Sequence, residues 1–194
     1  MKLELKIVDL LARNVERKFT INEIAKSLEE YYSFVHRTVN KLIKDNVITK
    51  EKAGKSYLCS LNLETEKTIA LVNLSEIEKK NDLYNSNKEL KIILDDFVKM
   101  TESVNPVSVV LFGSHAKGTA TKESDIDILL ISETKAGVDK ITKEVYAKYG
   151  KEVNVVLMAS GDFKKQKDKA LIKEVIKDHY ILYGAERFVN LVFK

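Results

Sequence analysis

The sequence of 194 residues predicts an α+β fold in two parts. Residues 1–46 show helical periodicity and are followed by two short strand-like segments. Further along the chain, helical segments alternate with apolar strand segments such as Val107–Phe112 and Asp125–Ile131. The polar, turn-prone run 81–87 separates the two series. We therefore expect a helical N-terminal part with a hairpin, and then a mixed β-sheet flanked by helices.

Composition excludes several classes of protein. Hydrophobic residues make up 44% and charged residues 32%, so the chain can bury a core and global disorder is excluded. The single cysteine, Cys59, rules out an intramolecular disulfide and a cysteine-rich zinc site. No apolar run approaches the ~20 residues that span a bilayer, and the charged N-terminal segment is unlike a signal peptide. We expect a cytoplasmic protein with no membrane partner.

The net charge of +4 is concentrated in one segment. Residues 31–58 contain six Lys and Arg against two Asp and Glu, and the rest of the chain holds 27 of each sign. Such a local excess is typical of a surface that binds phosphates, although a solvated lysine-rich face has the same composition. The expected structure of this segment has to decide between the two interpretations.

The N-terminal part predicts three helices and a basic hairpin. After a first amphipathic helix, Thr20 and Glu23 form a capping box that starts the second. Ser33 is expected to cap a third helix that stops near Asn46, and two strands follow. This order, over about residues 1–63, resembles a winged helix-turn-helix domain. In that fold the third helix enters the major groove and the hairpin contacts phosphate or the minor groove.

The resemblance implies double-stranded DNA as a partner. The candidate contacts lie on the exposed side of the third helix and on the hairpin: His36, Arg37, Asn40, Lys41, Lys44, Lys52 and Lys55. Arg37 and Asn40 suit bidentate contacts with bases, and they are equally able to contact phosphate alone. His36 is alternatively a simple surface histidine. Winged helices also serve as dimerisation or protein-binding modules, so a homodimer is the competing expectation.

Residues 64–86 predict a helical connector, because the segment has helical propensity and contains neither Pro nor Gly. This connector is expected either to pack a dimer or to cover the next domain. Ser86 or Asn87 then caps the first helix of the C-terminal domain, which we place at residues 87–194.

The chemistry is expected between the two apolar strands of that domain. A strand that runs into Gly113 and Ser114 and then into a helix presents N–H groups and a hydroxyl at a positive helix end. Gly113 lets the backbone approach an anion closely, and Gly118 relaxes the following turn. The spacing is not that of a Walker A loop. We therefore expect a phosphate cradle of a different type.

Asp125 and Asp127 lie two residues apart in the next strand, so both side chains point to one face, with Cβ atoms about 6–7 Å apart. An Asp-x-Asp pair is commonly a pair of surface acids. Here the apolar flanks predict a buried strand, in which two carboxylates need a neutralising cation. Mg²⁺ takes oxygen ligands and usually binds phosphate oxygens as well. The pair and the cradle together predict a site for a metal-bound nucleotide.

The segment GSHAKGTATKESDIDILL, residues 113–130, resembles the signature of the nucleotidyltransferase superfamily typified by DNA polymerase beta. More narrowly, it is similar to the minimal nucleotidyltransferases of archaea and bacteria, over about residues 87–190. The resemblance implies that Asp125 and Asp127 bind Mg²⁺. It also implies a set of nucleotide-binding residues: Gly113, Ser114, Lys117, Gly118 and Ser124.

The implied activity is transfer of a nucleoside monophosphate from a nucleoside triphosphate to a hydroxyl on a protein, a nucleic acid or a small molecule. Some relatives are antitoxins that add AMP to a partner toxin, so by analogy we expect a protein acceptor. The implied metal chemistry is activation of the attacking hydroxyl and stabilisation of the leaving pyrophosphate.

One position departs from the family pattern. The third carboxylate of the family, which helps to bind a second metal or takes the proton of the nucleophile, aligns with Asn154. An amide oxygen can coordinate a metal but is no general base at neutral pH, so two-metal binding is in doubt. Glu152, about 6–7 Å along the same strand face, is a candidate replacement. His115 is a second candidate base and is alternatively a surface residue.

Three hypotheses follow. The first is a Mg²⁺-dependent nucleotidyltransferase, with Asp125, Asp127, Asn154 and Glu152 as catalytic candidates, fused to a DNA-binding winged helix. The second is a DNA-binding transcriptional regulator that senses a nucleotide through a catalytically degenerate domain. The third is an interaction protein whose winged helix is a platform for a partner.

Overall fold

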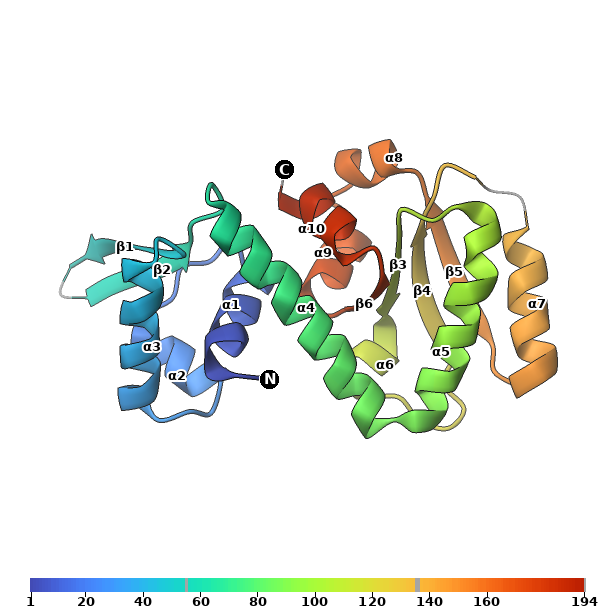
Figure 1. The fold of residues 1–194 in the computed structure, drawn as a ribbon, viewed down its shortest axis with the longest axis horizontal. Helices are drawn as coiled ribbons and strands as arrows, with labels where there is room; N and C mark the ends of the chain where they lie inside the picture. The colour runs from blue at the N-terminus through green and yellow to red at the C-terminus, as the bar shows by residue number, and fades with distance from the viewer. Residues whose placement is uncertain (55, 135–136, 194) are drawn as a thin grey trace. The chain divides into compact units, whose positions relative to one another are not determined.

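The computed structural model describes residues 1–54, 56–134 and 137–193 (Figure 1). The chain divides into two compact units, Met1–Glu78 (unit 1) and Lys79–Lys194 (unit 2). Lys55, one of the predicted DNA contacts, lies outside the described residues. Across the described residues, no helix combines the length and the apolar character needed to cross a membrane.

Unit 1 starts with three helices followed by a hairpin, the element order expected of a winged helix-turn-helix, and ends within the next helix. These elements are α1 (Leu3–Arg13), α2 (Ile21–Ser27), α3 (Tyr32–Lys44), β1 (Ile48–Ala53) and β2 (Ser56–Leu61). β1 and β2 pair antiparallel, and a bridge between Phe19 and Cys59 joins the segment before α2 to β2. Both residues are buried, so the single cysteine is a small residue of the core.

α2 starts where the sequence predicts, whereas α3 does not. Thr20 Oγ1 accepts a hydrogen bond from the Glu23 N–H at 3.1 Å, and Glu23 Oε2 accepts one from the Thr20 N–H at 2.7 Å, which completes the capping box. The prediction that Ser33 caps α3 is wrong. The helix begins at Tyr32, and Tyr31 at its cap position makes no side-chain hydrogen bond. The good capping propensity of Ser33 is therefore unused, because the helix starts before it.

α4 (Glu66–Ser86) is one uninterrupted helix. The expected turn over residues 81–87 is wrong, because a polar run without Gly or Pro does not by itself break a helix. The helix ends only at Ser86, directly before Asn87. The Asn87 side chain caps the next helix by accepting a hydrogen bond from the Leu90 N–H at 2.9 Å. The boundary between the two units falls inside α4.

Unit 2 is built on a mixed four-stranded sheet in the order β5-β4-β3-β6. The strands are β3 (Ser108–Phe112), β4 (Ile126–Ile131), β5 (Val153–Met158) and β6 (Tyr180–Tyr183). β3 pairs antiparallel with both β4 and β6, whereas β4 and β5 are parallel. This sheet with its helices confirms the predicted α+β class.

The helices of unit 2 determine which face of the sheet carries polar residues. They are α5 (Lys88–Thr101), the short η1 (Glu102–Val104), α6 (Gly113–Lys117), α7 (Val138–Tyr149), α8 (Ser160–Lys165), α9 (Ala170–Lys177) and α10 (Ala185–Phe193). α5 and α7 lie side by side, and their apolar residues share one core with Ile126, Ile128 and Leu130 of β4 (Figure 1). Side chains alternate along a strand, so Asp127 points to the opposite face.

Candidate functional site

The end of β3 brings Gly113 against Asp127. Phe112 and Asp127 are paired residues of β3 and β4, so the residue after Phe112 reaches the Asp127 side chain. Gly113 has a φ of 71°, and a Cβ built on it would overlap Asp127 Oδ2 and lie 2.9 Å from Asp127 Cγ. Glycine is required here twice, for the left-handed backbone and for the close approach. The carboxylate therefore lies directly beside the first residue of α6.

Asn154 lies beside the two aspartates. The parallel register of β4 and β5 pairs Asp127 with Asn154, and Asn154 Nδ2 donates to Asp125 Oδ2 at 3.3 Å. Asp125 and Asn154 are exposed, and Asp127 is half-buried. The described residues contain no cluster of three His, Cys, Asp or Glu able to hold a metal ion. The donor set is thus two carboxylates and one amide.

The short helix α6 forms the expected loop after β3. Gly118 ends it with a φ of 70° and donates its N–H to the carbonyl of Ser114, and the Thr119 N–H donates to the same carbonyl at 3.0 Å. Ser114 itself is half-buried. Ser124 Oγ accepts from the Thr121 N–H at 2.9 Å, so this hydroxyl closes the turn that leads to Asp125.

Lys117 has a partner within the chain. Its Nζ makes an ion pair and a hydrogen bond with Glu174 of α9. The hydrogen bond to Glu174, with the charge of that carboxylate, raises the pKa of Lys117. Sequence reasoning missed Glu174, since a glutamate in an amphipathic helix 57 residues away belongs to no motif. Lys117 has to leave this partner in order to bind a phosphate.

His115 is a partly buried residue rather than a surface histidine. Its Nε2 atom is buried without a hydrogen-bond partner. Burial lowers the pKa of His115, although a hydrogen bond with the backbone of Ser124 opposes the shift, so the imidazole is neutral at pH 7. His115 lines a cavity of about 630 Å³ together with Lys122 and Lys151. This cavity could not be predicted from the sequence, because its walls come from segments that are far apart in the chain.

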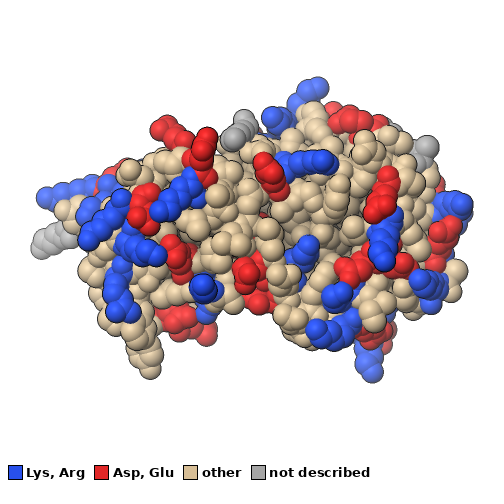
Figure 2. Space-filling model, viewed as in Figure 1, with Lys and Arg blue, Asp and Glu red and all other residues tan. Residues whose placement is uncertain are grey.

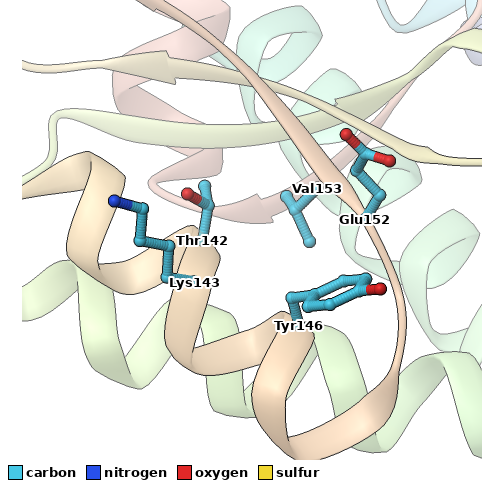
Figure 3. Close-up of a pocket in the computed structure, with 5 residues that line it drawn as sticks. All are labelled: Thr142, Lys143, Tyr146, Glu152 and Val153. Atoms are coloured by element: carbon cyan, nitrogen blue, oxygen red, sulfur yellow. The ribbon is translucent and has the colours of Figure 1, made fainter.

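Glu152 lies beside α7. β5 begins only at Val153, so the strand-face argument that placed Glu152 with Asn154 does not apply. The carbonyl of Glu152 accepts from the Ile126 N–H at 2.9 Å. Its exposed side chain lines a pocket of about 340 Å³, with Tyr146 and the other residues labelled in Figure 3. This pocket has a different set of walls from the group formed by the two aspartates and Asn154.

The described basic residues of the predicted DNA-binding set lie on α3 and the hairpin, and lysine and arginine side chains gather over that part of unit 1 in Figure 2. The exposed members of the predicted set are His36, Arg37, Lys41, Lys44 and Lys52, and Asn40 is half-buried. Lys41 forms an ion pair with Glu4 at 3.4 Å. The Asn40 amide nitrogen lies 3.2 Å from His36 Nε2. The described candidates therefore lie on α3 and the hairpin, and all except Asn40 are exposed.

Comparison with known proteins gives a match to the nucleotidyltransferase domain family over residues 88–183, from the first residue of α5 to the last of β6. "Putative protein adenylyltransferase MJ1305" of Methanocaldococcus jannaschii is 30% identical over 112 residues, which cover 52% of this chain and 76% of that protein. "Putative protein adenylyltransferase MJ0604" of the same organism is 34% identical over 77 residues, covering 39% and 76%.

A solved structure described as a toxin-antitoxin with AMP-PNP is similar at a TM-score of 0.40 and 19% identity, covering 51% of this chain and 79% of that one. At this level of similarity, individual residues of the two proteins cannot be matched.

Proposed function

The chain belongs to the nucleotidyltransferase family, and we propose that it transfers AMP from ATP to a hydroxyl on an acceptor protein. The observation that supports the reaction is the grouping of Asp125, Asp127 and Asn154 beside Gly113, where α6 begins. The choice of AMP and of a protein acceptor follows the names of the two relatives from Methanocaldococcus jannaschii.

The donor set fits a hard divalent cation such as Mg²⁺. Asp125 and Asp127 would hold it, and Asn154 can add its amide oxygen if the amide rotates away from Asp125. Bound there, Mg²⁺ supplies charge for the phosphoryl oxygens and acidifies the attacking hydroxyl. With a neutral amide in place of a third carboxylate, the site has ligands for one metal rather than two.

The residues of the chain itself then bind and orient the nucleotide. Gly113 leaves room for a phosphate next to the Asp127 carboxylate, and Ser114 contributes a hydroxyl. Lys117 exchanges Glu174 for a phosphate oxygen, which neutralises part of the triphosphate charge. Asn154 cannot accept the proton of the nucleophile. That proton has to pass to solvent, to a second group on the acceptor protein or to a neutral base such as His115.

The test is transfer of label from ATP in the presence of Mg²⁺, with cell extract to supply acceptors. Wild type is compared with Asp127→Asn and with Asp139→Asn, an equal charge change at an exposed position of α7. We expect protein labelling by wild type and by Asp139→Asn, and none by Asp127→Asn. If no nucleoside triphosphate gives label that depends on Asp127, the proposed reaction is wrong.

We propose in addition that unit 1 binds double-stranded DNA through α3 and the hairpin. The support is the exposed basic surface of these elements, which carries the whole net charge of the chain. Affinity for a labelled duplex should fall steeply with salt, and Arg37→Ala with Lys41→Ala should reduce both the affinity and the salt slope. Lys164→Ala with Lys165→Ala, on α8, is the matched control. Absence of binding at low salt would contradict this proposal.

Asn154 favours a second candidate function, a regulator that binds ATP without using it. The amide occupies the position opposite Asp127 and donates to Asp125, so a neutral group stands where catalysis would use a third carboxylate. A regulator of this kind predicts no transfer by wild type, together with DNA affinity that changes when ATP and Mg²⁺ are added. If ATP leaves DNA affinity unchanged, this second function is excluded.

A further inference from the structure

The first turn of α3 exposes three aromatic side chains. Tyr31, Tyr32 and Phe34 are 78%, 53% and 48% exposed. The rings of Tyr31 and Phe34 meet edge to face with centroids 6.1 Å apart, and Tyr32 lies 5.6 Å from the ring of His36. Clustered rings of this size on a surface indicate a binding site, because each leaves apolar area in water.

Cations lie against these rings. The guanidinium of Arg37 is 5.6 Å from the centroid of the Phe34 ring, and Phe34 lies about one helical turn before Arg37. A second pair of this kind lies on the hairpin, where Lys50 Nζ is 5.1 Å from the ring of Tyr57. Both places pair an exposed apolar ring with a positive charge, and a partner of α3 should present apolar groups within a field of negative charge. A second copy of this surface is disfavoured as that partner, because like charges would face each other.

The major groove of DNA has both properties. Thymine presents a C5-methyl group there, between two rows of phosphates, and phenylalanine is one of the side chains that contact it. The N-terminal residues of a recognition helix are the ones that reach the base edges. In α3 these residues are Tyr31, Tyr32 and Phe34, and the basic residues that can contact phosphate follow them.

We infer that Phe34 and Tyr31 read the C5-methyl groups of thymine, and that unit 1 selects duplexes with thymine under the start of α3. Arg37, oriented by the Phe34 ring, then reads a guanine next to that thymine through the O6 and N7 acceptors. This inference rests on the proposed DNA binding of unit 1 and adds to it the chemistry of the bases that are selected.

The test uses the whole chain. A duplex is first selected from a pool with a random core, and its thymines are then replaced by uracil, which lacks only the methyl group. Each contacted methyl that is lost should weaken binding about fourfold, equivalent to ~0.8 kcal/mol. Phe34→Ala should weaken binding of the thymine duplex and reduce the difference between thymine and uracil, and Phe34→Ala combined with Tyr31→Ala should remove that difference. Tyr146→Ala, at an exposed tyrosine of α7, should change neither.

Three outcomes would overturn the inference, and they are distinguishable. Equal affinity for thymine and uracil duplexes would refute methyl reading while leaving DNA binding in place. Absence of binding to any duplex at low salt would refute both. Unchanged DNA affinity of Phe34→Ala, with loss of a protein complex that wild type forms, would identify the rings as a protein-binding surface. Phe34 is exposed, so equal thermal unfolding of wild type and Phe34→Ala is expected and verifies that the variant folds.

Discussion

Gly113 lies against the carboxylate of Asp127 with no room for a side chain between them. Gly113→Ala should therefore displace Asp127 as well as strain the backbone at a φ of 71°. Strained backbone of this kind costs about 1–3 kcal/mol, and the overlap adds a cost of roughly the same size. We expect a lower free energy of unfolding in urea and loss of ATP binding measured by calorimetry.

Gly150→Ala is the matched control for this substitution, because Gly150 lies outside the predicted nucleotide-binding set. Gly150 has a φ of 64°, close to that of Gly113, and a Cβ there would meet nothing within 4 Å. The variant should show the backbone cost alone and keep most of its affinity for ATP. Equal loss of stability and of binding in the two variants would show that the contact with Asp127 has no role.

Asn154→Asp should make stability depend on a divalent cation. A third carboxylate next to Asp125 and Asp127 adds repulsion, and it replaces a hydrogen bond of 3.3 Å. We expect a lower melting temperature than wild type in EDTA and a larger rise on adding Mg²⁺. Asn154→Ala loses the hydrogen bond without adding charge, and it should show no such rise. If the melting temperature of Asn154→Asp does not change when Mg²⁺ is added, this would argue against a metal at this position.

The same variant also distinguishes the two proposed functions. If wild type does not transfer AMP and Asn154→Asp does, the domain is a degenerate enzyme that lacks only the third carboxylate. If wild type transfers AMP without the change, Asn154 is compatible with catalysis.

Glu174→Gln should bind ATP a few-fold more tightly than wild type. The Glu174 carboxylate holds Lys117 and raises the pKa of Lys117, so its removal frees the ammonium for phosphate and lets that pKa fall back. Lys117 remains charged at neutral pH in both proteins, because its ordinary pKa is 10.5. Titration calorimetry with ATP measures the effect. The control Glu144→Gln removes another ion pair, 3.7 Å from Lys140, and should leave ATP affinity unchanged.

His115 predicts a loss of stability in mild acid. Burial lowers the pKa of His115 in the folded chain below its ordinary value of 6.5. The neutral imidazole therefore contributes to the free energy of unfolding, and this contribution is fully present above pH 6.5. It is lost as the pH falls through the lower pKa of His115 in the folded chain, because the unfolded chain takes up the proton first. Urea unfolding at pH 7.5 and pH 5.5 should show a smaller advantage of wild type over His115→Gln at the lower pH. An advantage that does not change with pH would mean that His115 does not titrate in this range.

Local patterns predicted much of the fold. The capping box at Thr20 and the strands on either side of Gly113 depend on neighbouring residues, and the structure has them. The grouping of Asp127 with Asn154 was accessible too, because an alignment with a family strand implies a register. The start of α3 could not be predicted, because Ser33 has good capping propensity but the helix begins one residue earlier.

Contacts between distant segments could not be predicted. The pair formed by Lys117 and Glu174 depends on where α9 packs, and no spacing in the sequence encodes that. The same holds for the cavity beside His115, whose walls come from α5, α6, the segment 120–122, the first residue of β4 and Lys151 before β5. Glu152 shows the opposite error, because a strand was extended one residue too far and its alternation was then applied to a residue outside it.

The two units share a helix. α4 runs from Glu66 to Ser86, and the boundary between Glu78 and Lys79 falls within its hydrogen-bond ladder. Cutting the chain there would leave about four carbonyls on one fragment and four N–H groups on the other without partners. Neither unit can therefore be excised at that bond as an intact module.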